Sequence, residues 1–541
     1  MTTLIREKSS GAMLVGLVVA ILIMALLITG LVVVLGTGLM ESVETANASA
    51  AFFAAESGMS AAKAYVTTNS EWARSLPVSL TGMVGRSAFS ATITTTNRVT
   101  VNVTSTGARN EAEWTSVWGG TGTAVRAMFV YKDAVISNAF PRYRAYSHLG
   151  YACGELYAGN ITAEPQWQRI AADPRTNEYI LVSQNSSRWI YAQVWTGGAW
   201  FASTLLNNAG QCPSTLNRSC DVAYEQNSGR GMAVYSVGAN TPRYRTWDGT
   251  NWSAEAAINV GAAAGSQIRW LRLVARTNSN EMLLLSRWQV AANNLSAAIR
   301  WNGVAWVNLR ALENCASASI DTEPMDGGFL PAGAVTFYVN GNSANQRAQP
   351  KYRTFVGAAW GPENNLPTRL PGNSEPRWIR MEFNTNSTLG FVGFLYLNGA
   401  APQLTGSYWT GAAWGAYTNY SATLNTVTER DFDVAWSSRS NILMTAYCLQ
   451  GQTNHNYVAQ TYGGTAVYGT LAPGTDLGRW CYLAADPFYN EFLYGALDNA
   501  GDVVLQRWDG TRWRALVEAT AQSGFNYDSV GTAYRRDRLV P

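Results

Sequence analysis

The pattern of apolar positions divides the chain into an apolar N-terminal segment and a long region of short, alternating runs. Residues from Ala12 to Leu35 are almost all apolar, and no charged residue occurs between Ala12 and Met40. A helix over this run would measure roughly 36 Å, which exceeds the roughly 30 Å core of a bilayer. Arg6 and Lys8 precede the run, so the positive-inside rule places the N-terminus in the cytoplasm and the rest outside. The pattern predicts a long hydrophobic α-helix.

A helical period continues beyond this run. Six residues on that period share one helix face, at alternating spacings of four and three: Ala48, Phe52, Ala55, Met59, Ala62 and Val66. We expect one helix from Ala12 to about Val66, with a first half suited to lipid or to like helices and a second half packed on a small domain. The segment from Ser87 to Trp114 alternates and is rich in Thr and Val, which is typical of β-strands.

Two short segments resemble those of a known family. Lys8-Ser9-Ser10-Gly11, followed by Ala12 and its apolar run, resembles the prepilin peptidase site of type IV pilin-like proteins. The segment AFFAAESG at residues 51–58 is similar to the Ala-Ala-Glu-Ala-Gly segment of PilX-like minor pilins. The resemblance covers about residues 1–120, and it implies a small pilin-like sheet packed on the helix.

The resemblance also implies how the chain is processed and assembled. A prepilin peptidase would cut between Gly11 and Ala12, removing residues 1–11 as a leader, and the new N-terminus would be methylated. Other pilin subunits would then bind through the N-terminal helix. The expected location is the inner membrane before assembly and an extracellular pilus or the cell surface afterwards.

One position departs from the family pattern. Pilins usually carry Glu as the fifth residue of the mature chain, where it pairs with the N-terminal amine of a neighbouring subunit, and Gly16 stands there in this chain. A buried carboxylate is costly unless it is paired, and glycine can make no such pair. The departure favours a minor subunit over a main filament subunit, although a small residue could instead serve close helix packing.

From about Thr121 onward the chain repeats the signature aromatic-x-Gly-x-x-aromatic. The first aromatic residues of successive copies are 52, 54, 54, 54, 53 and 46 residues apart, with a weak copy at Tyr462. The Asp-Gly or Asn-Gly in several copies supplies the positive φ of a tight two-residue hairpin turn, and the aromatic residues can pair across its strands. The remaining copies are Trp195, Gly197 and Trp200; Trp247, Gly249 and Trp252; Trp301, Gly303 and Trp306; Phe355, Gly357 and Trp360; Trp409, Gly411 and Trp414; and Trp508, Gly510 and Trp513.

Two further markers keep the same period. The motif AADP at residues 171–174 recurs 313 residues later, and DVAY at 221–224 recurs as DVAW 212 residues later. A repeat of about 53 residues with four short strands has the size of a β-propeller blade. The tryptophans outside the turns fall largely at or near the opening strand of a blade, and these are Trp167, Trp270, Trp378, Trp436 and Trp480.

The sequence therefore predicts a mainly β protein in three parts: residues 1–11 as leader, 12–120 as helix and small sheet, and 121–541 as a β-propeller. We expect eight four-stranded blades, with seven blades or a solenoid of hairpins as alternatives. Gly531 to Arg536 resembles the opening strand of a blade, and Ala124 to Tyr151 resembles the second half of one. One blade shared between the two ends would leave no free strand edge.

Composition narrows the function classes. Aromatic residues reach 12% and the net charge is only +3, a composition that excludes a disordered chain. The low net charge and the lack of a basic run disfavour nucleic acid as a partner. The only two histidines, His148 and His455, leave little room for histidine-based catalysis or a His-rich metal site. Asp498 and Asp502 fit a polar loop better than a calcium site. The sequence predicts no catalytic residue, no metal and no cofactor.

Six cysteines permit disulfides outside the cell, and they are Cys153, Cys212, Cys220, Cys315, Cys448 and Cys481. Cys212 and Cys220 are eight residues apart, so we predict a local bridge between them. Cys448 and Cys481 fall in neighbouring blades and could also pair.

Together these features predict a minor pilin-like subunit of a type IV pilus or related filament. Its propeller would serve adhesion or the binding of an extracellular ligand, either a glycan or a surface protein. One alternative is an extracellular, membrane-anchored propeller enzyme acting on glycans, which predicts clustered carboxylates or arginines at the central channel. The other alternative is the main structural subunit of a decorated filament.

Overall fold

The computed structural model divides the chain into two compact units, Met1–Gly122 and Thr123–Pro541. The structure describes residues 8–68, 78–95, 101–109, 112–119, 125–132, 139–147, 150–151, 156–317, 319–421, 423–437, 439–473, 476–514, 517–521 and 530–534.

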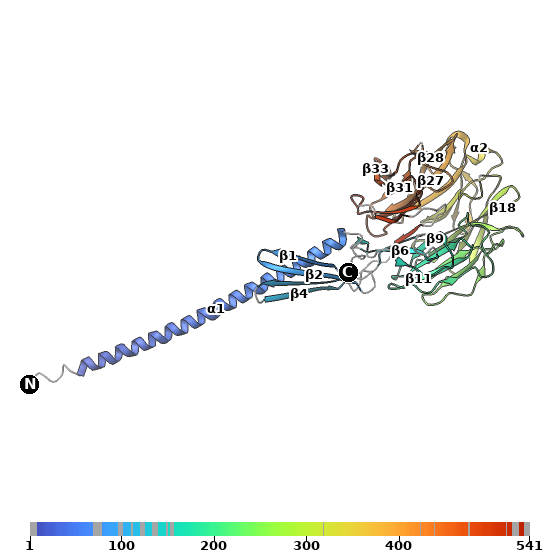
Figure 1. Ribbon diagram of the computed structural model, residues 1–541. Helices are drawn as coiled ribbons and strands as arrows, with labels where there is room; N and C mark the ends of the chain where they lie inside the picture. The colour runs from blue at the N-terminus through green and yellow to red at the C-terminus, as the bar shows by residue number, and fades with distance from the viewer. Residues whose placement is uncertain are drawn as a thin grey trace, which may run out of the picture. The chain divides into compact units, whose positions relative to one another are not determined.

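The first unit combines one long helix with one antiparallel sheet (Figure 1). Helix α1 runs from Lys8 to Thr68 and contains 61 residues. The strands follow one another in the order β1-β2-β3-β4, each paired with the next. Their bounds are Val78–Val84 for β1, Ser87–Thr95 for β2, Val101–Arg109 for β3 and Ala112–Gly119 for β4. The Thr- and Val-rich segment therefore supplies β2, β3 and the start of β4, and β1 lies outside it.

The second half of α1 packs on this sheet through small side chains. The buried residues of the helix are Ala51, Ala54, Ala55, Met59 and Ala62. The burial of Ala55, Met59 and Ala62 confirms half of the predicted stripe, but Ala48 is exposed and Phe52 keeps 37% of its surface exposed. The reason is the close approach of β3, where a Cβ atom on Gly107 would overlap the backbone of Ala51 and Ala55. Alanines fit against that strand, whereas a phenylalanine ring does not.

This close approach gives the first testable prediction. Replacing Gly107 with valine forces the helix away from β3, and we expect a loss of about 2–4 kcal/mol in the stability of the first unit because overpacking here meets backbone atoms. Thermal unfolding of full-length protein, followed by hydrogen exchange in α1, measures the effect. Thr104→Val is the matched control, since Thr104 is exposed on the same strand. Equal stability of the two variants would contradict the packing described.

The predicted fold class needs a correction at the N-terminus. Within the part of the chain that the structure describes, no helix is long and apolar enough to cross a membrane. The prediction of a long hydrophobic helix is therefore wrong as a statement about the described residues.

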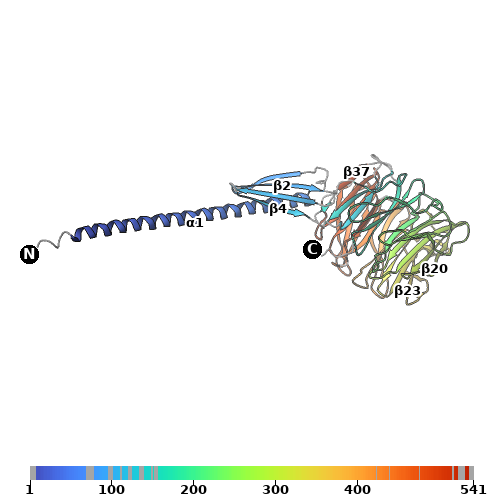
Figure 2. The same cartoon turned by 90° about the horizontal axis from the view of Figure 1, so that it is seen from below.

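The second unit is a β-propeller that contains eight antiparallel sheets among its described residues (Figure 2). We number the sheets as blades 1 to 8. Blade 1 contains β38 (Gly531–Tyr534), β5 (Ala127–Tyr131), β6 (Arg142–Ser147) and β7 (Gly150–Tyr151), with β8 (Leu156–Tyr157) also paired to β6. Blade 2 contains β9 (Pro165–Ala172), β10 (Tyr179–Asn185), β11 (Ile190–Trp195) and β12 (Thr204–Leu205). Blade 3 contains β13 (Cys220–Tyr224), β14 (Gly231–Tyr235), β15 (Arg243–Trp247) and β16 (Ala256–Ala257).

The remaining blades repeat this order. Blade 4 contains β17 (Ile268–Ala275), β18 (Met282–Val290), β19 (Asn293–Trp301) and β20 (Trp306–Cys315). Blade 5 contains β21 (Met325–Leu330), β22 (Gly333–Tyr338), β23 (Lys351–Val356), β24 (Ala359–Trp360) and β25 (Asn364–Asn365), with the short helices α2 (Ala344–Arg347) and η2 (Pro371–Asn373) nearby in sequence. Blade 6 contains β26 (Pro376–Phe383), β27 (Gly390–Asn398), β28 (Ala401–Trp409) and β29 (Thr418–Ser421). Blade 7 contains β30 (Phe432–Ser437), β31 (Ile442–Cys448), β32 (Asn454–Thr461) and β33 (Val467–Pro473). Blade 8 contains β34 (Gly478–Ala485), β35 (Phe492–Asp498), β36 (Asp502–Trp508) and β37 (Val517–Ala521).

The ring closes through blade 1, which takes strands from both ends of the unit. Strand β38 pairs with β5, so that Gly531 faces Val130 and Tyr534 faces Ala127. The first strands of the blades contact one another in a full circle, in which β38 touches both β34 and β9. The predicted blade shared between the two ends is confirmed, and the described sheets number eight rather than seven.

The aromatic signature forms the hairpin between the third and fourth strands of a blade. The two aromatic residues pair across the hairpin, as Trp247 does with Trp252. The glycines of the five Trp-to-Trp copies have φ between 90° and 100°, which glycine adopts without strain. Four residues lie between the paired tryptophans of the Trp-to-Trp copies, and there the predicted two-residue turn is wrong. The extra residues are held by Asp248, whose Oδ1 accepts the N–H groups of Thr250 (2.8 Å) and Asn251 (2.7 Å). In blade 5 the predicted two-residue turn is confirmed, because Val356 pairs with Ala359 around the two residues Gly357 and Ala358.

Candidate functional site

The first strands of the blades line the central channel with alternating charges. One position on each strand carries arginine in β9, β17 and β26 and aspartate in β13, β21 and β30. In β34 tyrosine takes the place of arginine, and in β38 threonine takes the place of aspartate. In circular order these residues are Arg169, Asp221, Arg272, Asp326, Arg380, Asp433, Tyr482 and Thr532. The structural repeat therefore contains two blades, twice the period that the turn signature indicates.

A closed ring of four tryptophans fills the channel beside these charges. The ring centroids of neighbours lie 5.3 to 5.7 Å apart and their planes are nearly perpendicular, at 80° to 85°. Three of the indoles donate from Nε1 to carbonyl oxygens of loops that follow later in the chain, those of Thr215, Ile320 and Val427. The members of this tryptophan ring are Trp167, Trp270, Trp378 and Trp480, all at most 3% exposed. They come from every second blade, two residues before the arginine or tyrosine position.

The aspartates of the channel tie each blade to the next. Oδ2 of Asp221 accepts the backbone N–H of Leu273 at 2.8 Å, and Oδ2 of Asp326 accepts that of Met381 at 2.9 Å. Asp433 makes the same bond to Leu483 at 3.0 Å. Ion pairs reinforce these links, such as Arg272 Nε to Asp326 Oδ1 at 3.1 Å.

A second group of charges lies three residues before the aspartates, and its members are Arg218, Glu323 and Arg430. Glu323 is fully buried and forms ion pairs with Arg218 and with Arg380, the latter at 2.9 Å. Burial alone would raise the pKa of Glu323. The positive charges of the surrounding arginines outweigh this effect and lower the pKa to about 2. The enzyme alternative predicted clustered arginines and carboxylates at the channel, and they are present. Their bonds to each other and to the backbone, however, serve to hold the blades together.

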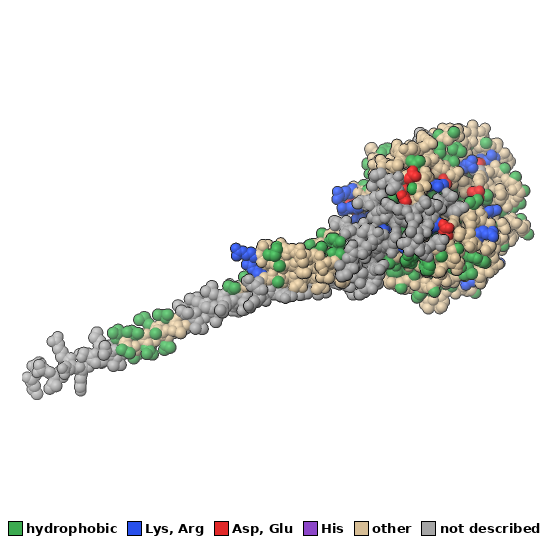
Figure 3. Space-filling view, in the orientation of Figure 1, with side chains coloured by type: hydrophobic (Ala, Val, Ile, Leu, Met, Phe, Trp, Pro, Cys, Tyr) green, Lys and Arg blue, Asp and Glu red, His purple; other side chains and the backbone are tan. Residues whose placement is uncertain are grey.

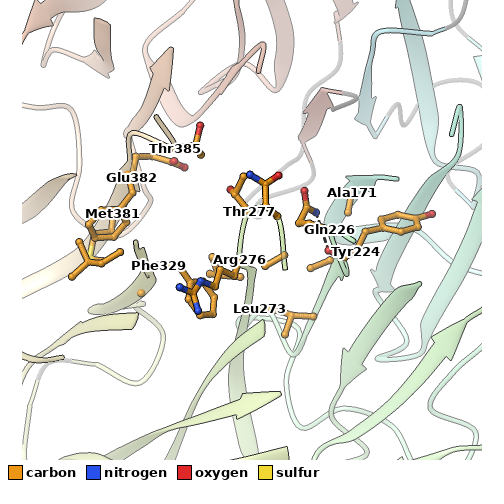
Figure 4. A pocket seen from close by; sticks show the side chains of 18 of the residues that line it. Ala171, Tyr224, Gln226, Leu273, Arg276, Thr277, Phe329, Met381, Glu382 and Thr385 are labelled. Carbon is orange, nitrogen blue, oxygen red and sulfur yellow. Dashed lines mark hydrogen bonds between the residues drawn. The ribbon is translucent and has the colours of Figure 1, made fainter. Parts of the chain in front are cut away.

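The channel opens into a cavity of about 390 Å³ at the ends of the first strands. Figure 4 shows Phe329 and Arg276 near its centre, with Gln226 and Thr277 on one side and Glu382 on the other. The Arg276 guanidinium pairs with Glu281 and donates to the carbonyl oxygen of Pro331 at 2.6 Å, which fixes its position. We call this the mouth cavity. It combines apolar walls with hydroxyl, amide and charged groups, the usual make-up of a site for a polar ligand.

A smaller cavity of about 160 Å³ lies deeper, at the level of the alternating charges. It shares Arg272, Met381 and Glu382 with the mouth cavity, so the two are neighbours along the channel. We call it the inner cavity.

The residues of the turn signature lie away from these cavities, whereas both long-spaced markers contribute residues to the cavity walls, such as Ala171 and Val222. Two of the signature tryptophans bind a carboxylate of the preceding blade: Nε1 of Trp247 donates to Glu178 at 3.0 Å, and Nε1 of Trp301 donates to Glu225 at 2.6 Å. These bonds support a structural role for the signature. In the first unit, Gly11, Ala12 and Gly16 lie within α1.

The predicted disulfide between Cys212 and Cys220 is absent, because both are buried free thiols. Cys212 Sγ contacts the carbonyl oxygen of Ser214 at 3.5 Å, and burial raises the pKa of this thiol to about 12. Cys448 and Cys481 are also free thiols, with sulfurs 3.2 Å apart across blades 7 and 8. Cys153 lies outside the described residues.

His455 is buried between blades 7 and 8, and His148 lies outside the described residues. Nδ1 of His455 is 2.5 Å from the hydroxyl oxygen of Tyr494. Burial lowers the pKa of His455 from about 6.5 to about 4, because the apolar surroundings disfavour the imidazolium. The remaining acidic candidates form a turn, in which Asp498 Oδ1 accepts the N–H of Asp502 at 2.8 Å.

This histidine makes stability depend on pH. The unfolded chain binds a proton at His455 below about pH 6.5, whereas the folded chain resists it until about pH 4, so acidification across this window destabilises the fold by roughly 3 kcal/mol. We expect His455→Gln to flatten the curve of unfolding free energy against pH between these limits. Denaturant unfolding at several pH values measures it, and NMR titration of the histidine gives its pKa directly. An unchanged slope in the variant would show that His455 titrates normally.

The alternating charges were not recognised from the sequence, although a signal was available. Each arginine of the channel follows a tryptophan by two residues, as in Trp167-Gln-Arg169 and Trp378-Ile-Arg380. The two markers found at long spacing were six and four blades apart, both even numbers, which fits a repeat of two blades.

Comparisons with known proteins identify no family for this chain. No family model and no curated protein matches it. Among solved structures it is similar to the BP39L lectin from Burkholderia pseudomallei, with 13% identity, 65% of this chain and 99% of that chain covered, and a TM-score of 0.48. It is also similar to the six-bladed β-propeller lectin of Aleuria aurantia, with 10% identity and a TM-score of 0.33. This likeness covers 57% of this chain and 97% of that chain. A prolyl endopeptidase shares 11% identity over 65% of this chain and 49% of that chain, with a TM-score of 0.37. At these identities and TM-scores the likeness says nothing of what this propeller binds, and the fold assignment rests on the sheet topology.

Proposed function

We propose that the chain is a minor subunit of a type IV pilin-like filament, and that its propeller binds an extracellular ligand at the mouth cavity. The observation that carries the filament role is the exposure of apolar side chains in the first half of α1. Its second half packs on the four-stranded sheet, whereas the described side chains before Thr29 have no cover from the sheet. Ten large apolar residues there, between Leu17 and Ile28, keep 50% to 67% of their surface exposed (Figure 3).

These exposed side chains point around the whole helix, and not along one stripe. A helix that is apolar on every side is stable in water only when other apolar surface covers it. The N-terminal helices of other filament subunits would supply such cover. The Gly11-Ala12 junction before this segment supports processing by a prepilin peptidase, and Gly16 favours a minor over a main subunit.

The ligand-binding role is supported by the mouth cavity. Propeller loops at this end are carried by rigid first strands, a common arrangement for binding sites. Phe329 offers an apolar face in the cavity, and Thr277 and Gln226 offer polar groups opposite it. A glycan or a polar segment of a surface protein fits this mixture. Catalysis has less support, because the channel carboxylates Asp221, Asp326 and Asp433 are engaged in holding blades together.

N-terminal sequencing of the protein from its native host tests the filament role. We expect a mature chain that begins at Ala12 and co-purifies with other pilin subunits. Gly11→Leu is the control, since it should block cleavage and leave the chain out of filaments. A chain that begins at Met1 would overturn the proposal.

The proposed ligand-binding role is tested by screening the full chain on arrays of glycans and surface proteins. Phe329→Ala should weaken any specific binding at least tenfold, because the ring lies in the mouth cavity. Phe201→Ala is the matched control, since Phe201 is 48% exposed and does not line that cavity. Equal loss in both variants would place the ligand elsewhere.

A further inference from the structure

The inner cavity is lined by more cationic than anionic side chains. The imbalance arises where the alternating pattern breaks, because Thr532 stands at the position that carries aspartate in three other blades. Tyr482 replaces one arginine, but Arg430 adds another guanidinium next to it, 4.6 Å from the ring centroid. The charged residues that line this cavity are Arg169, Arg272, Arg380 and Arg430 against Asp221, Glu382 and Asp433.

Three buried donors of this cavity make no hydrogen bond to any described residue. They are Nε of Arg380, Nε of Arg430 and the hydroxyl of Thr532. The other nitrogens of the two arginines are engaged, since Arg380 donates to Glu323 at 2.9 Å and Arg430 donates to the carbonyl oxygen of Cys481 at 2.9 Å. The side chains of the two arginines are only 4% and 3% exposed. Buried donors call for an acceptor. Other buried donors of the chain, such as Nε of Arg218, also lack one, but these three line the same cavity.

Asp433 offsets part of the positive charge of both guanidinium groups but leaves the three donors without a hydrogen bond. Oδ2 of Asp433 already accepts the N–H of Leu483, and its Oδ1 lies 3.4 Å from Arg430 and 3.9 Å from Arg380. Burial lowers the pKa of Arg380, and the positive charge of Arg430 lowers it further, which is the mark of cations facing each other. A water molecule could accept these hydrogen bonds, but an anion would also offset positive charge that Asp433 alone shares between the two guanidinium groups.

We propose that the inner cavity binds a small monovalent anion, held by Nε of Arg380, Nε of Arg430 and the hydroxyl of Thr532. Guanidinium groups and a hydroxyl are strong donors to such anions, and the charge-assisted bonds would tie blades 1, 6 and 7 together. The volume of about 160 Å³ accommodates a halide, nitrate or formate. The anion would enter through the mouth cavity, which shares lining residues with the inner one. This site does not depend on the filament role or on the ligand of the mouth cavity.

Bromide is the probe for this site, used with the full chain. We expect crystals grown in bromide to show anomalous scattering in the inner cavity, in contact with Arg380 and Arg430. In solution, replacing a bulky sulfonate salt by bromide at constant ionic strength should raise the melting temperature by about 2 °C or more, because an anion that binds only the folded state stabilises it. Equal melting temperatures in the two salts would overturn the proposal, as would bromide seen only in crystals.

A pair of isosteric variants separates specific binding from general salt effects. Thr532→Val removes one donor of the cavity and should reduce the bromide-induced shift by at least half. Thr336→Val is the matched control, since Thr336 is also buried with a hydroxyl that has no hydrogen-bond partner among the described residues, but it does not line the cavity. The control should keep the full shift. If Thr532→Val does not fold, the anomalous scattering from the unaltered chain decides, and its absence refutes the site.

Discussion

A chain that ends at Val530 should fail to form a stable propeller. Such a chain lacks β38, which supplies the first strand of blade 1 and all four of its paired residues, from Gly531 to Tyr534. Without it, β5 presents an open edge to the channel and the circle of first strands is broken between β34 and β9. We expect a fall in melting temperature of more than about 10 °C, or aggregation, because the cooperative unit is the closed ring.

The matched control for this truncation ends at Tyr534, which keeps every paired residue of β38. It should melt within about 2 °C of the full chain. Size-exclusion chromatography and circular dichroism of both truncations measure the outcome. A chain ending at Val530 that stays monomeric and melts like the control would show that the ring does not need its C-terminal strand.

The number of blades and the way the ring closes could be predicted from the sequence because they depend on local signals. Each hairpin carries its own glycine and its own aromatic pair, as in Trp195-Gly197-Trp200, and such a motif repeats visibly along the chain. The strand at Gly531 could be matched to other opening strands by similarity alone. The four-residue length of the turn was missed, since it depends on how Asp248 folds back on the backbone.

The candidate site could not be derived in the same way. The channel charges are single residues on six of the eight first strands, and their alternation becomes meaningful only once those strands are known to be innermost. Arg169 and Asp221 are 52 residues apart and have opposite charges, so they do not look like copies of one position. A two-blade unit explains the difference, because arginine and tryptophan come from one blade and aspartate from the next.

The packing face of α1 shows a similar limit. Periodicity placed Phe52 on the buried stripe because large apolar residues are usually buried. The structure buries Ala51 and Ala54 instead, since Gly107 lets β3 approach the helix backbone more closely than a ring would permit. A glycine in a distant strand thus decides which face of the helix is used, and a helical pattern alone cannot reveal it.

The tryptophan ring should be the most sensitive point of the propeller core. Trp378 is 1% exposed, contacts Trp270 and Trp480 edge to face, and donates from Nε1 to the carbonyl oxygen of Val427 at 3.0 Å. Trp378→Ala leaves a cavity where four blades meet, and we expect a loss of about 3–5 kcal/mol in the free energy of unfolding. Denaturant unfolding measures the loss, and near-ultraviolet circular dichroism should lose the signal of the packed indoles.

Two comparisons separate the ring from tryptophan content in general. Trp306→Ala removes a half-buried indole of a turn signature and should cost about 1–2 kcal/mol, since less of its surface is withdrawn from water. Phenylalanine at Trp378 should cost more than phenylalanine at Trp480, because the Trp480 indole N–H makes no hydrogen bond to any described residue and so loses none. Equal losses for Trp378→Ala and Trp306→Ala would mean that the four indoles fill the channel without supporting it. The blades would then be held together by the bonds from Asp221, Asp326 and Asp433, and those carboxylates would become the next positions to substitute.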